Sequence, residues 1–242
     1  LINANKKVVD GKALYPRMYG DDGWYAYAPG PWSEGALECY FWTLEPHDHA
    51  RVSGHSWIAY LDGKNPGFPE SALRGDLGTI RQKVAGMRED ETTPDTRLAD
   101  DPMKFNPATV GTLRQLMMAG LDPGRGAAPL HCRLRYFDPH RRRAGVPEDV
   151  AALIDQMTDS HVRVTLVNTN QLVARRVVVQ TGAYGEHQCR KVTLGDLVTD
   201  VEGPAFTVTL APGAGAQLTI ETDRYANQPT LVFPWDRWKI QK

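Results

Sequence analysis

A dense run of aromatic and acidic residues lies between positions 20 and 35. Its rings are Trp24, Tyr27 and Trp32, and its carboxylates are Asp21, Asp22 and Glu34. Sugar recognition uses this combination, because carboxylates accept hydrogen bonds from hydroxyl groups and aromatic faces pack on the apolar face of a pyranose ring. We therefore expect the rings to bind substrate and Asp22 or Glu34 to act as acid, base or charge neutraliser. An ordinary Asp-Asp-Gly turn with packed loop aromatics is the alternative interpretation.

A second candidate is the segment 183–188, which stands between two predicted strands. Tyr184, Glu186 and His187 together offer an acid, a base and an orienting group, so Tyr184 and His187 are candidates for proton transfer. The alternative is a structural loop in which Tyr184 packs and Glu186 pairs with a nearby arginine such as Arg190.

No other group of residues specifies a cofactor or a metal. His47, His49 and His55 form the one histidine cluster, but a metal site needs three or four ligands with supporting groups, and nothing specifies the fourth. We interpret this segment as a helix-connecting loop and expect neither metal nor cofactor. The chain has no P-loop, no GxSxG and no HExxH sequence, so nucleotide-dependent transfer, α/β-hydrolase chemistry and zincin proteolysis lack their usual motifs.

The elements that must position these residues change character near the middle of the chain. Apolar residues recur at helical spacing in the first half, which predicts helices over residues 33–42, 51–61, 70–87 and 107–118. Beyond residues 122–128 the apolar period becomes two, which predicts strands over 130–137, 161–166, 173–180, 188–194, 206–210 and 216–221. Residues 211–215 read as a hairpin loop, and Pro147 with two acidic neighbours predicts a short helix over 147–157.

The composition bounds the class of protein. The chain has 242 residues with 28 Lys and Arg against 29 Asp and Glu, so its net charge gives no reason to expect nucleic acid as a partner. Its longest apolar runs are far shorter than a membrane span requires, so we expect no membrane partner either. The sequence begins at Leu1 without an initiator Met or a visible signal peptide, and we interpret it as a mature chain or a fragment whose compartment stays open.

Helices joined by aromatic, Gly- and Pro-rich loops and followed by strands resemble the last turns of an α/α toroid leading into a β-sandwich. The segment from Gly20 to Gly35 carries most of this resemblance, which is to polysaccharide lyases of the heparinase and alginate-lyase type and to several glycoside hydrolases. The resemblance implies an α+β fold with a partial toroid over 1–124, a sandwich over 125–242, and further toroid helices preceding this chain.

The resemblance also implies a function. It indicates a lyase or hydrolase that cleaves a polysaccharide in a cleft between the helical and β parts. Two alternatives stay open: a hydratase or isomerase acting on a small terpenoid-like molecule in an enclosed pocket, and a non-catalytic sugar-binding or structural module.

Overall fold

The chain is an α+β protein, and its computed structural model describes residues 2–31, 35–93, 106–121 and 129–237. Contacts between Cα atoms group the chain into two compact units, Leu1–His55 and Ser56–Lys242. The boundary predicted between residues 124 and 125 lies outside the described residues. Each unit is treated below by itself.

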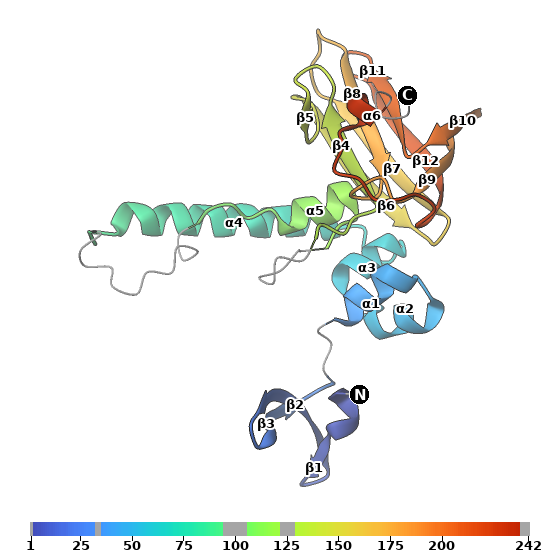
Figure 1. Cartoon of the computed structure of the whole chain (residues 1–242). Coiled ribbons are helices and arrows are strands. Elements are labelled where there is room, and N and C mark those ends of the chain that lie inside the picture. Colours follow the sequence, from blue (N-terminus) through green and yellow to red (C-terminus); the bar gives the residue numbers. More distant parts are fainter. Residues whose placement is uncertain (1, 32–34, 94–105, 122–128, 238–242) are drawn as a thin grey trace. The chain divides into compact units, whose positions relative to one another are not determined.

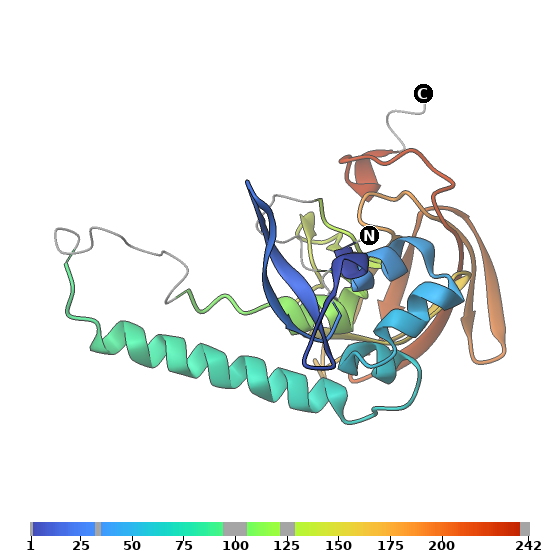
Figure 2. The ribbon, with the colours of Figure 1, turned by 90° about the horizontal axis from the view of Figure 1, so that it is seen from below.

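The first unit contains a small antiparallel sheet where the sequence predicted loops. Its strands run in the order β1 (Lys7–Val9), β2 (Lys12–Gly20) and β3 (Gly23–Pro29), drawn in blue in Figures 1 and 2. Asp21 and Asp22 form the two-residue turn between β2 and β3, and the positive φ of 94° at Gly23 suits the residue that follows such a turn. The helical region expected over 1–124 is therefore wrong for these residues.

Two helices complete the first unit, α1 (Ala36–Thr43) and α2 (Pro46–Val52), preceded at the N-terminus by a short 3-10 turn, η1 (Ile2–Asn5). The predicted apolar face of α1 is confirmed, because Tyr40 and Phe41 are buried. The single helix predicted over 51–61 is wrong. It is interrupted between Val52 and Ser56, where Ser53 and Gly54 lower the tendency to continue a helix.

The second unit contains the predicted antiparallel β-sandwich (Figure 1). One sheet has the order β10-β9-β12-β7-β6 and the other the order β11-β8-β4-β5. The strands are β4 (Leu134–Asp138), β5 (Arg143–Ala144), β6 (Val150–Met157), β7 (His161–Asn168), β8 (Arg175–Thr181), β9 (Gln188–Leu194), β10 (Leu197–Gly203), β11 (Ala205–Leu210) and β12 (Gly215–Asp223).

The sandwich core follows from the period of two in these strands. Along β7 every second residue is buried, and Val162, Val164 and Leu166 point inward. Val177 and Val179 of β8 face them from the other sheet, together with further fully buried residues of β4, β6 and β12, namely Leu134, Ile154 and Ile220. Burial of these side chains is the main source of stability for a sheet pair of this kind.

Two local predictions in this unit are wrong. Residues 150–157 form strand β6 and not a helix, because pairing with β7 buries Val150, Ala152 and Ile154 on one face. Residues 211–215 do not close a hairpin, since β11 and β12 belong to different sheets. The segment instead crosses between the layers, and the buried amide of Asn168 donates hydrogen bonds to the carbonyl oxygens of Val173 and Ala211 at 2.8 and 3.1 Å.

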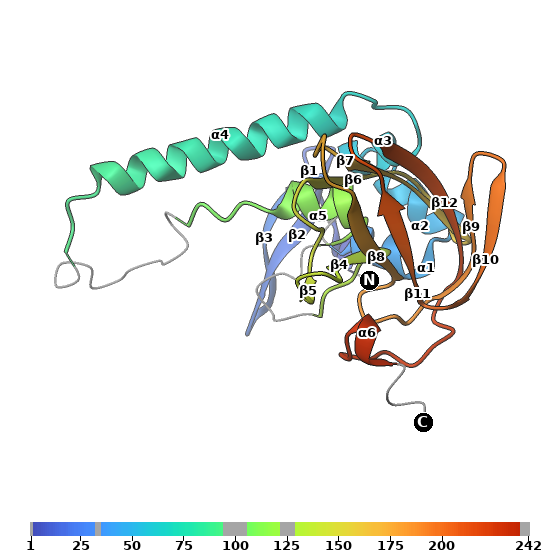
Figure 3. The same cartoon turned by 90° about the horizontal axis from the view of Figure 1, so that it is seen from above.

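Four helices accompany the sandwich: α3 (Ser56–Leu61), α4 (Phe68–Glu89), α5 (Gly111–Met118) and α6 (Pro234–Arg237). Figure 3 shows α5 beside β4 and β6, and the hydroxyl of Tyr136 on β4 donates a 2.6 Å hydrogen bond to the carbonyl of Met117. α6 lies on the outer face of the four-stranded sheet, where Trp235 makes an edge contact with Phe137. No helix among the described residues is long and apolar enough to cross a bilayer.

Candidate functional site

The aromatic residues predicted to bind substrate divide between the two faces of the β2–β3 hairpin. Residues directly opposite each other in an antiparallel pair share a face, so the register assigns each ring to one side. Trp24 pairs with Tyr19, whereas Tyr27 pairs with Pro16 and Tyr25 pairs with Met18. Trp24 therefore lies on one face, and Tyr25 and Tyr27 lie on the other.

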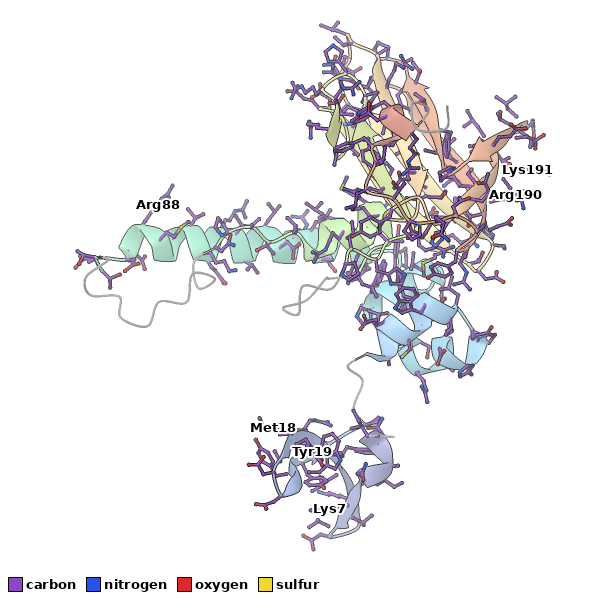
Figure 4. The ribbon with its side chains drawn as sticks, in the orientation of Figure 1. Lys7, Met18, Tyr19, Arg88, Arg190 and Lys191 are labelled. Carbon is purple, nitrogen blue, oxygen red and sulfur yellow. The ribbon has the colours of Figure 1, made fainter. Side chains whose placement is uncertain are left out.

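The face that carries Trp24 presents an open aromatic pair. The rings of Tyr19 and Trp24 meet edge to face with their centroids 5.0 Å apart. Tyr19, which is labelled on the hairpin in Figure 4, is 70% exposed. Arg17 lies on the same face and donates hydrogen bonds to the carbonyl oxygens of Pro29 and Gly30, which fixes the end of β3. Tyr19 was not predicted from the sequence, although its position across the hairpin from Trp24 would have identified it once the turn was recognised.

The rings on the opposite face already have close partners. The ammonium group of Lys7 lies 4.2 Å from the centroid of the Tyr27 ring, which is a cation–π contact. Tyr25 lies over Gly20, where an added Cβ would meet its ring at 3.0 Å. The predicted substrate contact at Tyr27 therefore competes with Lys7 for the ring face.

The acidic residues predicted beside the aromatic surface are only partly described. Asp21 and Asp22 are exposed at the tip of the hairpin, next to the Tyr19–Trp24 pair. Trp32 and Glu34 lie outside the described residues. Tyr184 and His187 belong to the second unit, so the candidate catalytic residues come from separate units.

The second candidate, the loop between β8 and β9, is folded around Glu186. The Glu186 carboxylate accepts hydrogen bonds from the backbone N–H groups of Ala183 and Tyr184 at 3.1 and 2.7 Å. Gly182, with φ 81°, makes room for this carboxylate. The hydroxyl of Tyr184 accepts a hydrogen bond from the backbone N–H of Leu130 at 3.2 Å. Glu186 thus anchors its own loop and does not pair with Arg190, whose partner is Asp223.

His187 is buried at the end of the sandwich, with 1% of its surface exposed. Its Nδ1 accepts a 3.1 Å hydrogen bond from the backbone N–H of Tyr225, and the Tyr225 ring packs edge-on against it. Burial, followed by the charges of Arg133 and Arg224, lowers the pKa of His187 to about 3. At neutral pH the ring is therefore uncharged, and its proton lies on Nε2 because Nδ1 is an acceptor.

Other clusters singled out in the sequence have ordinary structural partners. The sequence places three arginines in a row at 141–143, and their nearest acidic neighbours in the sequence favour a solvated, salt-bridged surface. Arg141, Arg142 and Arg143 do form ion pairs, with Glu148, Asp236 and Asp138. His47 and His49 lie within helix α2, so the loop predicted for this segment is wrong for them. His47 pairs with Asp48, and the His49 ring packs edge-on against Tyr40. Within the described part of the chain, no three His, Cys, Asp or Glu side chains gather as a metal ion would require.

The sandwich also carries open cavities of about 360–370 Å³. One lies on the outer face of the four-stranded sheet, between Val178 and Thr207 on one side and Pro234 and Trp235 of α6 on the other. One face of the Trp235 ring is stacked on Phe233, with the planes 7° apart. These cavities are open to solvent, unlike the enclosed pocket that an isomerase for a small apolar molecule would need.

Residues 45–114 match a family model described as a domain of unknown function (DUF8034), a stretch that includes α2, α3, α4 and the first half of α5. No curated protein and no solved structure matches the chain.

Proposed function

We propose that this chain binds carbohydrate, and that the Tyr19–Trp24 face of the β2–β3 hairpin is the binding surface. The observation that supports this is an aromatic pair, an exposed Tyr19 against a half-buried Trp24, placed beside two exposed carboxylates on a short, turn-closed hairpin. Exposed aromatic surface is costly to leave in water and is more often found where a ligand or partner binds. Aromatic rings give apolar contact to a sugar, and the carboxylates of Asp21 and Asp22 accept bonds from its hydroxyl groups.

The charge of the turn favours one class of glycan. Two adjacent carboxylates repel a uronic acid polymer, whereas they can hydrogen-bond a neutral sugar without a charge penalty. We therefore expect a neutral polysaccharide to bind better than an anionic one such as alginate. Cleavage of the bound chain by Asp22, Glu34, Tyr184 and His187 remains a prediction, and the burial of His187 argues against its direct contact with a polysaccharide chain.

The binding surface predicts unequal effects of three neighbouring aromatic substitutions. Tyr19→Ala and Trp24→Ala should each weaken binding of neutral oligosaccharides by at least about tenfold, because each removes stacking area on the proposed face. Tyr25→Ala is the matched control, since Tyr25 is a similarly exposed ring of the same hairpin on the opposite face. Isothermal titration calorimetry of the full chain against neutral and alginate oligosaccharides measures all three.

Two results would contradict the proposal. One is equal weakening by Tyr25→Ala and Tyr19→Ala, which would indicate general destabilisation of the hairpin. The other is a parent protein that binds neither class of oligosaccharide at millimolar concentration. Circular dichroism of each variant establishes that the fold is retained.

A further inference from the structure

A positively charged side chain is buried at the end of the sandwich without a counter-charge. Arg133, just before β4, has 1% of its surface exposed. Of its guanidinium nitrogens, only Nη2 has a hydrogen bond, to the carbonyl oxygen of Thr158 at 3.3 Å, while Nε and Nη1 have no partner. Among the described residues, no carboxylate forms an ion pair with it.

The acidic groups that influence Arg133 either accept hydrogen bonds from other groups or are too far away to form an ion pair with it. Glu186 influences Arg133 electrostatically, but both of its oxygens accept backbone N–H groups of its own loop. Asp159 also acts on Arg133 only at longer range. Burial, followed by the charge of Arg224, lowers the pKa of Arg133 to about 10, so the guanidinium still carries its charge at neutral pH. An isolated buried charge of this kind is strongly unfavourable unless a partner neutralises it.

Two further buried groups of the same unit also have unused polar atoms, and one of them, His187, is close enough to Arg133 for their charges to interact. His187 Nε2, which carries the proton of the neutral ring, has no hydrogen-bond partner, and neither does the hydroxyl of Thr222. Thr222 lies opposite Cys189, two residues after His187, at an irregularity in the register of β12 and β9. The backbone N–H of Thr222 bonds to Ser160, two residues from the Thr158 carbonyl that holds Arg133. Three chain segments therefore contribute unpaired donors at this end of the sandwich, and the carbonyl oxygens of Thr158 and Ser160 connect two of them.

We propose that Arg133, His187 and Thr222 bind a small oxyanion, a carboxylate or a phosphate group, at this end of the sandwich. Guanidinium, imidazole N–H and hydroxyl groups are all hydrogen-bond donors, and an oxyanion supplies the several acceptors and the negative charge that they lack. Of the three residues, Thr222 lines an open cavity of about 360 Å³, whose other lining residues include Ser160, Arg190, Glu221 and Asp223. The site is separate from the hairpin and does not depend on carbohydrate binding.

The experiment is a titration of the full chain, dialysed into a buffer free of phosphate and carboxylates. Sodium phosphate and sodium acetate are added separately at constant ionic strength, and the thermal unfolding midpoint is recorded. A ligand that binds only the folded state raises this midpoint along a curve set by its dissociation constant. We expect a saturable rise with at least one anion. The stronger response distinguishes phosphate from carboxylate.

Substitutions identify the site. Arg133→Met should raise the half-saturating anion concentration at least about tenfold, and Thr222→Val, which removes only the hydroxyl, about threefold. Arg176→Met is the control, because Arg176 is an exposed arginine on β8, and it should respond like the parent. If Arg133→Met does not fold, Thr222→Val and Arg133→Lys carry the test. No saturable response in the parent, or the same response in Arg133→Met or Thr222→Val as in Arg176→Met, would overturn the proposal.

Discussion

At the scale of single residues, Gly182 is a demanding position. Its φ is 81°, and a Cβ added there would lie 2.4 Å from the carboxyl carbon of Glu186. Any side chain must therefore adopt a strained backbone conformation and also displace the carboxylate that holds the β8–β9 loop together.

Gly182→Ala should lower the free energy of unfolding by about 2–4 kcal/mol for two reasons. Alanine is strained at this positive φ, and its Cβ displaces the Glu186 carboxylate, which then loses its hydrogen bonds to the loop. Gly195→Ala separates the two contributions. Gly195 also has a positive φ, 56°, but no atom lies within 4 Å of an added Cβ, so we expect a loss of about 1–2 kcal/mol. Urea denaturation measures both variants, and equal losses would show that Glu186 contributes nothing.

The sequence predicted interactions between residues that are close along the chain better than interactions between distant segments. The ion pairs of Arg141 and Arg143 were predictable, because acidic residues stand close by in the sequence, whereas the partner of Arg142, Asp236, lies far along the chain. The environment of Arg133 was not predictable either, since it comes from segments near positions 158, 187 and 222. Tyr19 and Trp24 could be assigned to the same face of the hairpin only after the register of β2 and β3 was known.

At the scale of elements, α4 is a long helix in which no side chain is buried. Phe68–Glu89 contains no buried residue, and Leu77 is half exposed. Its stability therefore depends on intrinsic helix propensity more than on packing. Gly75 and Gly78 stand inside it with open space around an added Cβ.

Gly75→Ala and Gly78→Ala should each stabilise α4 by about 0.5–1 kcal/mol, because alanine loses less backbone entropy in a helix. Amide hydrogen exchange within residues 68–89 should slow by about two- to fivefold. Gly63→Ala is the opposite case, since Gly63 has φ 75° and alanine there should destabilise the turn after α3. Unchanged exchange in both helix variants would mean that α4 does not open independently.

Element type was predictable where one period dominated. The helix at 70–87 and the strands β7, β8 and β9 match their patterns closely. Residues 150–157 satisfy both periods, because Val150, Ile154 and Met157 also lie at helical spacing, and pairing with β7 decided the outcome. The sequence pattern gave no indication of β10, whose exposed face and edge position leave no apolar alternation.

At the scale of the whole molecule, the helices around the sandwich are part of its stability. Leu116 of α5 is 2% exposed, and α5 packs on β4 and β6. The isolated bridge between Gly120 and Cys132 continues this connection. A cut at the predicted boundary near residue 124 would therefore remove a layer that the strands need.

We expect the fragment 128–242 to be less stable than 107–242 by at least about 2 kcal/mol, the order of one buried leucine. The fragment 56–242, which also retains α3 and α4, should be the most stable of the three. Urea denaturation with a hydrophobic dye as a second probe ranks them. An equally stable, dye-silent 128–242 fragment would show that the strands form a self-sufficient domain and that the predicted boundary is the functional one.

The strand order has one more consequence, for colloidal behaviour. β10 forms an outer edge of the five-stranded sheet, and its row of unpaired backbone groups could accept a strand from another molecule. Asp200 and Glu202 place negative charges along it, and its pairing with β9 is irregular between Asp200 and Gly203. Repulsion between like charges and the irregular register both oppose pairing of this edge with the same edge of another copy. We therefore expect the exposed Leu197 and Val198 not to cause fibre formation. Screening those charges with salt should reveal this protection as a loss of solubility.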